Sequence, residues 1–199
     1  MTRIIRTIAI ALAAASTFTL AACGGAPSES PPLEGATIGG DFTLTGKDGK
    51  PVRWSDFDGK YRIVYFGYTF CPDVCPTDLQ NIAQAVKLLG EKNPELAAKV
   101  VPIFITIDPQ RDTPETVGKF AASFGPTVVG LTGTPEQIAD VAKKWSTYYK
   151  RGEGSSETEY LMDHLRASYL MGPKGEPIAL LPSEQNGKAV AAELLKWVH

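Results

Sequence analysis

The sequence predicts an α/β fold in which a central mixed β-sheet is flanked by helices and preceded by an N-terminal β-hairpin. Apolar, β-branched runs, such as residues 61–67 and 100–107, have the length and composition of buried strands. Segments with helical spacing alternate with these runs, and a second hairpin pattern occurs near the C-terminus. Alternating helices and strands that end in a hairpin are typical of a sheet with both parallel and antiparallel neighbours.

The folded region begins with a predicted hairpin. Residues 42–44 and 52–54 are short alternating runs, and residues 47–50, Lys-Asp-Gly-Lys, form a turn signal between them. Asp58-Gly59 then turns the chain into the next strand.

A strand, a helix and a second strand follow the hairpin. The run at 61–67 predicts a strand, and apolar residues at helical spacing after Pro76 predict a helix from about 76 to 89. Residues 100–107 predict a buried strand, and Pro102 favours a start of that strand at the proline itself.

The remaining elements complete the alternation. Residues 112–115, Asp-Thr-Pro-Glu, predict the start of a helix that ends near residue 125, because they combine a capping residue, a proline and an acid. A strand is expected over 128–131 and a helix over 135–148, followed by a polar loop over 150–159. The chain closes with the following predicted elements: strands 168–171 and 178–181 in a hairpin, and a helix over 188–198.

The N-terminus is typical of a bacterial lipoprotein signal. Two arginines precede an apolar stretch, and Leu20-Ala21-Ala22-Cys23 forms a lipobox, which predicts lipidation of Cys23. An ordinary signal peptide with an incidental cysteine is the alternative. We therefore expect a signal peptide over 1–22, a flexible lipid-anchored linker over 23–35, rich in proline, glycine and serine, and one folded domain over 36–199.

The charge balance excludes one class of partner. The chain carries 20 Lys and Arg against 22 Asp and Glu, a formal net charge of −2, and it contains no basic tract. We therefore expect no nucleic-acid partner.

The pair Cys71 and Cys75, in Cys-Pro-Asp-Val-Cys directly after the predicted strand 61–67, carries the chemistry of the domain. The third cysteine of the chain is Cys23 in the signal, so any thiol chemistry of the folded domain belongs to this pair. The pair lies at or near a helix N-terminus, which favours thiolate. Three intervening residues form a wider loop than the usual two of dithiol redox sites, which favours metal binding over redox exchange. A structural disulfide is a further alternative in an exported protein.

A histidine completes the candidate metal set. The sequence holds His164 and the C-terminal His199, and chain ends are the least ordered positions, so His164 is the natural third ligand. Two thiolates and one imidazole suit three-coordinate Cu(I), accommodate Cu(II), and fit zinc less well because zinc requires a fourth ligand. Asp163 either holds the imidazole in place or is a solvated acid.

The chain resembles the Sco/SenC proteins over about residues 40–199. The stretch 65–77, Tyr-Phe-Gly-Tyr-Thr-Phe-Cys-Pro-Asp-Val-Cys-Pro-Thr, is similar to the family's signature. Residues 108–114, Asp-Pro-Gln-Arg-Asp-Thr-Pro, match a second motif, and Asp163-His164 matches a third. The sequence departs from the family where Leu165-Arg166-Ala167 replaces the usual Ser-Ala after the histidine and where residues 172–175, Gly-Pro-Lys-Gly, replace a Met-Asp-Pro-Asp-Gly turn.

The resemblance implies a thioredoxin-like three-layer fold and a copper metallochaperone. Its implied ligands are Cys71, Cys75 and His164, and its implied role is assembly of the binuclear copper centre of cytochrome c oxidase. The implied partners are the copper-accepting oxidase subunit and other periplasmic copper chaperones or thiol reductants. The implied location is the periplasmic face of the membrane, with the inner membrane favoured.

Two enzyme functions remain as alternatives. In a thiol-disulfide oxidoreductase, Cys71 and Cys75 would cycle between dithiol and disulfide and reduce the copper-ligand cysteines of the acceptor, while His164 would at most tune a pKa. A thiol peroxidase would need an arginine near its reactive cysteine, and no arginine lies between Arg62 and Arg111. Residues 108–114 either dock a partner or only cap a helix and pair with one another.

Overall fold

A five-stranded mixed sheet lies at the centre of the computed structural model, which describes residues 29–152, 156 and 159–199. The strand order is β5-β4-β3-β8-β9, with β3, β4 and β5 parallel and β8 antiparallel to both of its neighbours. The strands are β3 (Tyr61–Gly67), β4 (Val100–Thr106), β5 (Val129–Leu131), β8 (Ser168–Met171) and β9 (Pro177–Leu181). The predicted mixed sheet is confirmed.

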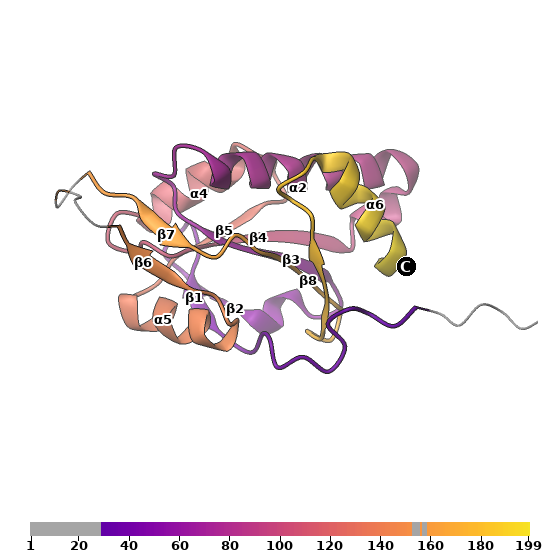
Figure 1. The fold of residues 1–199 in the computed structure, drawn as a ribbon, viewed down its shortest axis with the longest axis horizontal. Coiled ribbons are helices and arrows are strands. Elements are labelled where there is room, and N and C mark those ends of the chain that lie inside the picture. The colour runs from indigo at the N-terminus through magenta and orange to yellow at the C-terminus, as the bar shows by residue number, and fades with distance from the viewer. Residues whose placement is uncertain (1–28, 153–155, 157–158) are drawn as a thin grey trace, which may run out of the picture. The chain divides into compact units, whose positions relative to one another are not determined.

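Helices cover both faces of this sheet, which gives three layers (Figure 1). On one side lie α2 (Val74–Lys92), α4 (Pro114–Ala122) and α6 (Gly187–Trp197). On the other side lie α5 (Pro135–Lys144), the predicted hairpin of β1 (Thr43–Thr45) and β2 (Pro51–Arg53), and the 3-10 helix η1 (Trp54–Phe57). A short helix, α3 (Pro94–Ala97), follows α2 and was not predicted.

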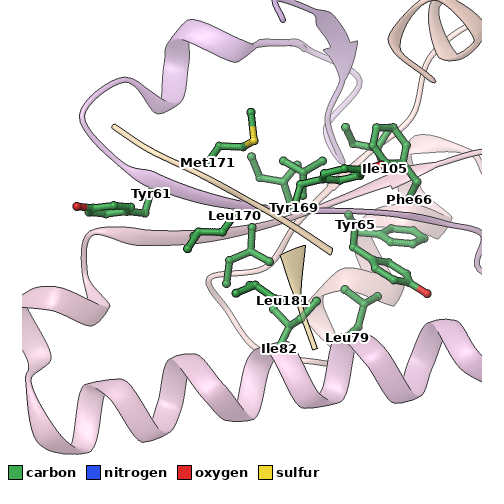
Figure 2. Close-up of a cluster of buried hydrophobic side chains, with 14 of the residues drawn as sticks. Tyr61, Tyr65, Phe66, Leu79, Ile82, Ile105, Tyr169, Leu170, Met171 and Leu181 are labelled. Atoms are coloured by element: carbon green, nitrogen blue, oxygen red, sulfur yellow. The ribbon is translucent and has the colours of Figure 1, made fainter. Parts of the chain in front are cut away.

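The core between α2 and the sheet follows the two side-chain periodicities. Leu79 and Ile82 of α2 point toward the sheet, where Leu170 and Leu181 meet them (Figure 2). These four side chains are at most 3% exposed. Because successive strand residues point to opposite faces, Met171 lies on the far side of the sheet from its neighbour Leu170.

An aromatic cluster fills the opposite face of the sheet. The indole of Trp145, just after α5, is fully buried and packs with ring centroids 5.3 Å from Trp54, 5.9 Å from Phe66 and 5.7 Å from Tyr169. The interplanar angles of these pairs run from 59° to 81°, in the tilted and edge-to-face range that aromatic quadrupoles favour. Aromatic packing thus fixes the N-terminal hairpin and α5 to the sheet.

Two short strands that the sequence did not predict follow α5. The helix expected over 135–148 ends at Lys144, and Ser146 has a positive φ of 49°, which a helix cannot contain. β6 (Tyr149–Arg151) then pairs with β7 (Met162–His164) in a separate two-stranded sheet. These strands are three residues each and mostly half-buried or exposed, so they lack the hydrophobic alternation by which strands are predicted.

The expectation that a strand starts at Pro102 was also wrong. β4 begins at Val100, and Pro102 lies within it opposite Ile63 of β3. The pairing of β4 with β5 starts only at Ile103, so β4 has a single neighbouring strand at the proline. A residue without an N–H group is tolerated there because the ladder is one-sided.

The described part of the chain is one compact unit over residues 31–199. Within the described residues, no helix has both the length and the apolar character needed to cross a bilayer. The predicted signal peptide and the lipidation site Cys23 lie outside the described residues.

Candidate metal centre

The candidate site lies where β3 ends. Gly67 is the last residue of β3, and the chain then passes through Cys71 into α2. β8 is antiparallel to β3, with Ser168 opposite Tyr65, so the segment that precedes β8 arrives at the same end of the sheet. This topology brings His164 to the cysteines. The carboxyl ends of parallel strands are the usual place for ligand sites in open α/β sheets.

The three predicted ligand atoms converge. Cys75 Sγ lies 3.4 Å from His164 Nε2, and the ligand atoms of Cys71, Cys75 and His164 all lie within 4.8 Å of one another. Metal bonds of about 2.3 Å to sulfur and about 2.0 Å to imidazole nitrogen place ligand atoms around one ion at separations close to these. Among the described residues, this is the one group of three or more Cys, His, Asp or Glu side chains with metal-binding spacing.

The two cysteines are free thiols in different environments. Cys75 lies in the first turn of α2 and is fully buried, whereas Cys71 precedes the helix and is half-buried. The backbone N–H of Cys75 donates to Cys71 Sγ at 3.4 Å, as expected at a helix N-terminus. Burial raises the pKa of the Cys75 thiol far above its ordinary value, so the expected thiolate preference was wrong for Cys75.

The imidazole of His164 is held with one nitrogen facing the thiols. Its Nδ1 lies 3.1 Å from the backbone oxygen of Leu165, and since a carbonyl only accepts, Nδ1 carries the proton in this contact. Nε2 is then unprotonated and faces Cys75. Burial lowers the pKa of His164, which favours the neutral form that can bind metal.

Aromatic edges and a backbone carbonyl, rather than an acid, surround this imidazole. The rings of Tyr65 and Tyr68 lie with their centroids 6.4 and 6.1 Å from the imidazole, nearly perpendicular to it. Asp163 is exposed, and the Nδ1 contact is made by Leu165, so the solvated role is the one that the structure supports for Asp163.

The other histidine lies at the opposite end of β3. His199 lines a cavity of about 360 Å³ together with Tyr61, the first residue of β3, and Trp197. The cysteines follow the last residue of β3. The two histidines therefore lie at opposite ends of β3, and only His164 is beside the thiols.

The polar side chains of the motif 108–114 form hydrogen bonds with other residues of this chain. Arg111 Nε donates to Asp108 at 2.5 Å, and the Tyr160 hydroxyl donates to the same carboxylate at 2.7 Å. Asp112 accepts from the backbone N–H and the hydroxyl of Thr69, two residues before Cys71. Of the two readings offered by the sequence, the structure shows side chains that pair with one another and tether the loop before the cysteines.

Sequence reasoning missed the charged network beneath the site. The carboxylate of Asp78 is fully buried and accepts a hydrogen bond from the Tyr65 hydroxyl at 3.0 Å. Arg166 forms a two-point ion pair with the same carboxylate, at 2.7 and 2.5 Å. A signal for it was present, because Asp78 lies three residues after Cys75 on the helix face that Leu79 and Ile82 bury.

Comparison with known proteins shows which family this chain is similar to. The SCO1/SenC family model matches residues 30–199. The SCO1 homolog 1 of Arabidopsis thaliana, a mitochondrial protein, is 42% identical over 149 residues, which are 75% of this chain and 43% of the relative. The mouse SCO2 homolog, also mitochondrial, is 40% identical over 72% of this chain and 56% of its own length. The chain thus spans about half the length of these curated relatives.

Solved structures of relatives share the fold. The ScoI of Bradyrhizobium japonicum, whose structure has copper bound, is 38% identical, with a TM-score of 0.72 over 81% of this chain and 99% of that chain. The ScoI of Arabidopsis thaliana, also with copper bound, is 37% identical, with a TM-score of 0.73 over 80% of this chain and 96% of that chain.

Proposed function

Since this chain belongs to the SCO1/SenC family, we propose that it is a copper metallochaperone that binds one copper ion through Cys71, Cys75 and His164. The observation that carries the proposal is the convergence of these three ligand atoms within 4.8 Å at the end of β3. The copper-bound structures of two relatives support the choice of metal.

The donor set favours Cu(I) over zinc. Two sulfurs and one imidazole nitrogen are soft ligands that suit three-coordinate Cu(I), and they also accommodate Cu(II). Zinc would need a fourth donor, and among the described residues no further Cys, His, Asp or Glu joins the cluster. Binding at Cys75 displaces the thiol proton that burial retains, so copper uptake releases acid.

The surroundings of the site suit transfer of the ion to another protein. Phe70, next to Cys71, is 53% exposed, and Leu165, next to His164, is 42% exposed. Cys71 itself is half-buried, so one ligand remains accessible from outside. Apolar side chains beside a partly open site are a feature of surfaces that dock a partner.

We propose that the acceptor is a copper-binding subunit of cytochrome c oxidase and that the transferred copper enters its binuclear centre. This proposal rests on family membership and on the sequence resemblance. Other periplasmic copper chaperones or thiol reductants are the proposed sources of copper and electrons. The lipobox at Cys23 supports anchoring at the periplasmic face of the membrane, with the inner membrane favoured.

An anaerobic titration of the reduced protein with Cu(I) against a competing chelator tests the copper site. Wild type should bind one copper tightly, and His164→Ala should lose at least about tenfold in affinity, because one of three ligands is removed. The matched control is His199→Ala, which removes the other histidine of the chain and should bind like wild type. Equal affinities for wild type and His164→Ala would contradict the three-ligand site.

A second candidate function is reduction of the acceptor's cysteines before copper arrives. The free state of both thiols and the greater exposure of Cys71 favour it. In this reaction Cys71 attacks the acceptor disulfide, Cys75 resolves the mixed disulfide, and the acceptor leaves as a dithiol while this pair becomes a disulfide. Incubation of the copper-free protein with an oxidised two-cysteine peptide measures this exchange, which should survive His164→Ala but not Cys75→Ser.

A thiol peroxidase is less well supported. The arginines that the fold brings near the site have other partners, since Arg111 pairs with Asp108 and Arg166 with Asp78.

A further inference from the structure

The ion pair between Asp78 and Arg166 links the two halves of the candidate site. Asp78 lies three residues after Cys75 in α2, and Arg166 lies two residues after His164. The pair therefore joins the helix that carries one ligand to the segment that follows another.

The geometry of this pair is that of a rigid connection. Arg166 Nε donates to one carboxylate oxygen of Asp78 at 2.7 Å, and Nη2 donates to the other at 2.5 Å. The Asp78 side chain is fully buried, while that of Arg166 is 35% exposed. A two-point guanidinium–carboxylate contact fixes both distance and orientation, unlike a contact through a single point charge.

The strand that ends at His164 lies outside the central sheet. β7, which ends at His164, pairs with β6 in a two-stranded sheet that is separate from the central sheet. On the N-terminal side of β7, Arg111 Nη1 donates to the backbone oxygen of Tyr160 at 3.0 Å. On the C-terminal side of His164, Arg166 is the ion-paired side chain that reaches α2.

We propose that Arg166 and Asp78 are positioning residues that hold His164 at copper-binding distance from Cys75 before copper arrives. The inference rests on the proposed copper site. A preorganised ligand binds more tightly because less conformational freedom is lost when the metal arrives. Residues 165–167, where this sequence departs from its family, include Arg166 and so supply the guanidinium that pairs with Asp78.

Two variants are needed to test the ion pair, because removing Arg166 leaves the buried charge of Asp78 without its partner. Arg166→Gln removes the partner of a buried carboxylate, which also costs stability. Asp78→Asn keeps the volume of the side chain, and the partly exposed Arg166 remains in contact with water. Both variants should bind Cu(I) at least about tenfold more weakly than wild type in the chelator titration. The matched control is Glu115→Gln, which breaks the exposed pair with Lys119 in α4 and should leave copper affinity unchanged.

A double-mutant cycle separates positioning from a general structural effect. If Arg166 acts through His164, Arg166→Gln should cost no further copper affinity in a His164→Ala background. An equal loss of affinity in both backgrounds would overturn the proposal. Wild-type affinity in both Asp78→Asn and Arg166→Gln would overturn it as well.

A copper-free measurement distinguishes a failure of the positioning role from a failure of the proposed copper site. Proton NMR of the reduced protein should show cross-relaxation between the His164 ring and the Tyr65 and Tyr68 rings, which lie edge to face with it. These signals should be lost in Arg166→Gln and Asp78→Asn and retained in Glu115→Gln. If the wild type fails to bind Cu(I) but both variants lose these signals, the copper site is rejected and the positioning role stands. If both variants retain the signals, the positioning role is rejected.

Discussion

Cys75 Sγ and His164 Nε2 lie 3.4 Å apart although 89 residues separate them in the sequence. The contact forms because β8 returns antiparallel beside β3 and brings the preceding segment to the end where the cysteines lie.

The first prediction concerns the two thiols. In the reduced, copper-free protein, iodoacetamide should alkylate Cys71 much faster than Cys75, since Cys71 is half-buried whereas Cys75 is fully buried with a raised pKa. Mass spectrometry of quenched samples measures both rates. Unfolding in denaturant should make the rates similar. Faster labelling of Cys75 in the folded protein would contradict the described burial.

The second prediction concerns the space under the site. A Cβ atom added at Gly67 would lie 2.9 Å from Cys75 Sγ, 3.0 Å from the Phe104 ring and 3.1 Å from the Tyr65 ring. Gly67→Ala should therefore displace Cys75, weaken Cu(I) binding, and lower the free energy of unfolding by about 1–3 kcal/mol. The control is Gly90→Ala, in the second half of α2, which should bind copper like wild type. Unchanged copper affinity in Gly67→Ala would show that the sulfur has room to move.

The third prediction concerns the core and uses two adjacent leucines of α6. Leu194 is fully buried, whereas Leu195 is 45% exposed. Leu194→Ala should lower the free energy of unfolding by about 2–5 kcal/mol, because it leaves a cavity. Leu195→Ala should change it by about 0.5 kcal/mol or less. Urea denaturation measures both values, and similar costs for the two variants would contradict the packing of α6.

The fourth prediction concerns pH. Burial raises the pKa of Asp112 above its ordinary 3.8, although hydrogen bonds from Thr106 and Thr69 oppose the shift. The folded protein therefore holds this proton more tightly than the unfolded chain. The resulting contribution to stability is fully present below pH 3.8 and is lost as the pH rises through the folded-state pKa.

The comparison of wild type with Asp112→Asn measures this effect. The free energy of unfolding of wild type minus that of the variant should fall as the pH rises from 3.8 toward neutrality and then level off. Urea denaturation at a series of pH values gives the difference. A difference that increases over this range would mean that the hydrogen bonds outweigh burial at Asp112.

The central sheet could be predicted from the sequence because its signals are local. Residues 61–67 were expected as a strand and form β3, since a short run of mainly aromatic and β-branched residues after a turn signal favours a buried strand. The hairpin of β8 and β9 was predicted from its turn residues in the same way. The strands β6 and β7 were missed because each has only three residues, and most of their side chains are polar and exposed or half-buried.

The candidate ligands could also be chosen from the sequence, but the ion pair that lies beside them could not. Cys71, Cys75 and His164 were few enough for elimination to find them. The ion pair of Asp78 with Arg166 joins residues 88 positions apart, and no local pattern links an aspartate in a helix to an arginine in a loop. The raised pKa of Cys75 was missed for a related reason, because burial in the finished core outweighs the helix terminus.

The strand order has a consequence for the order of events during synthesis of the chain. β3 is central in the sheet, yet its partner β8 is made about a hundred residues after β3. Until β8 arrives, β3 presents an unpaired hydrophobic edge of the kind that aggregates, and the two thiols are already present without their histidine. A nascent chain at this stage therefore carries the dithiol of the candidate site before its imidazole exists. The topology makes this intermediate more open to aggregation and to thiol oxidation than the finished fold.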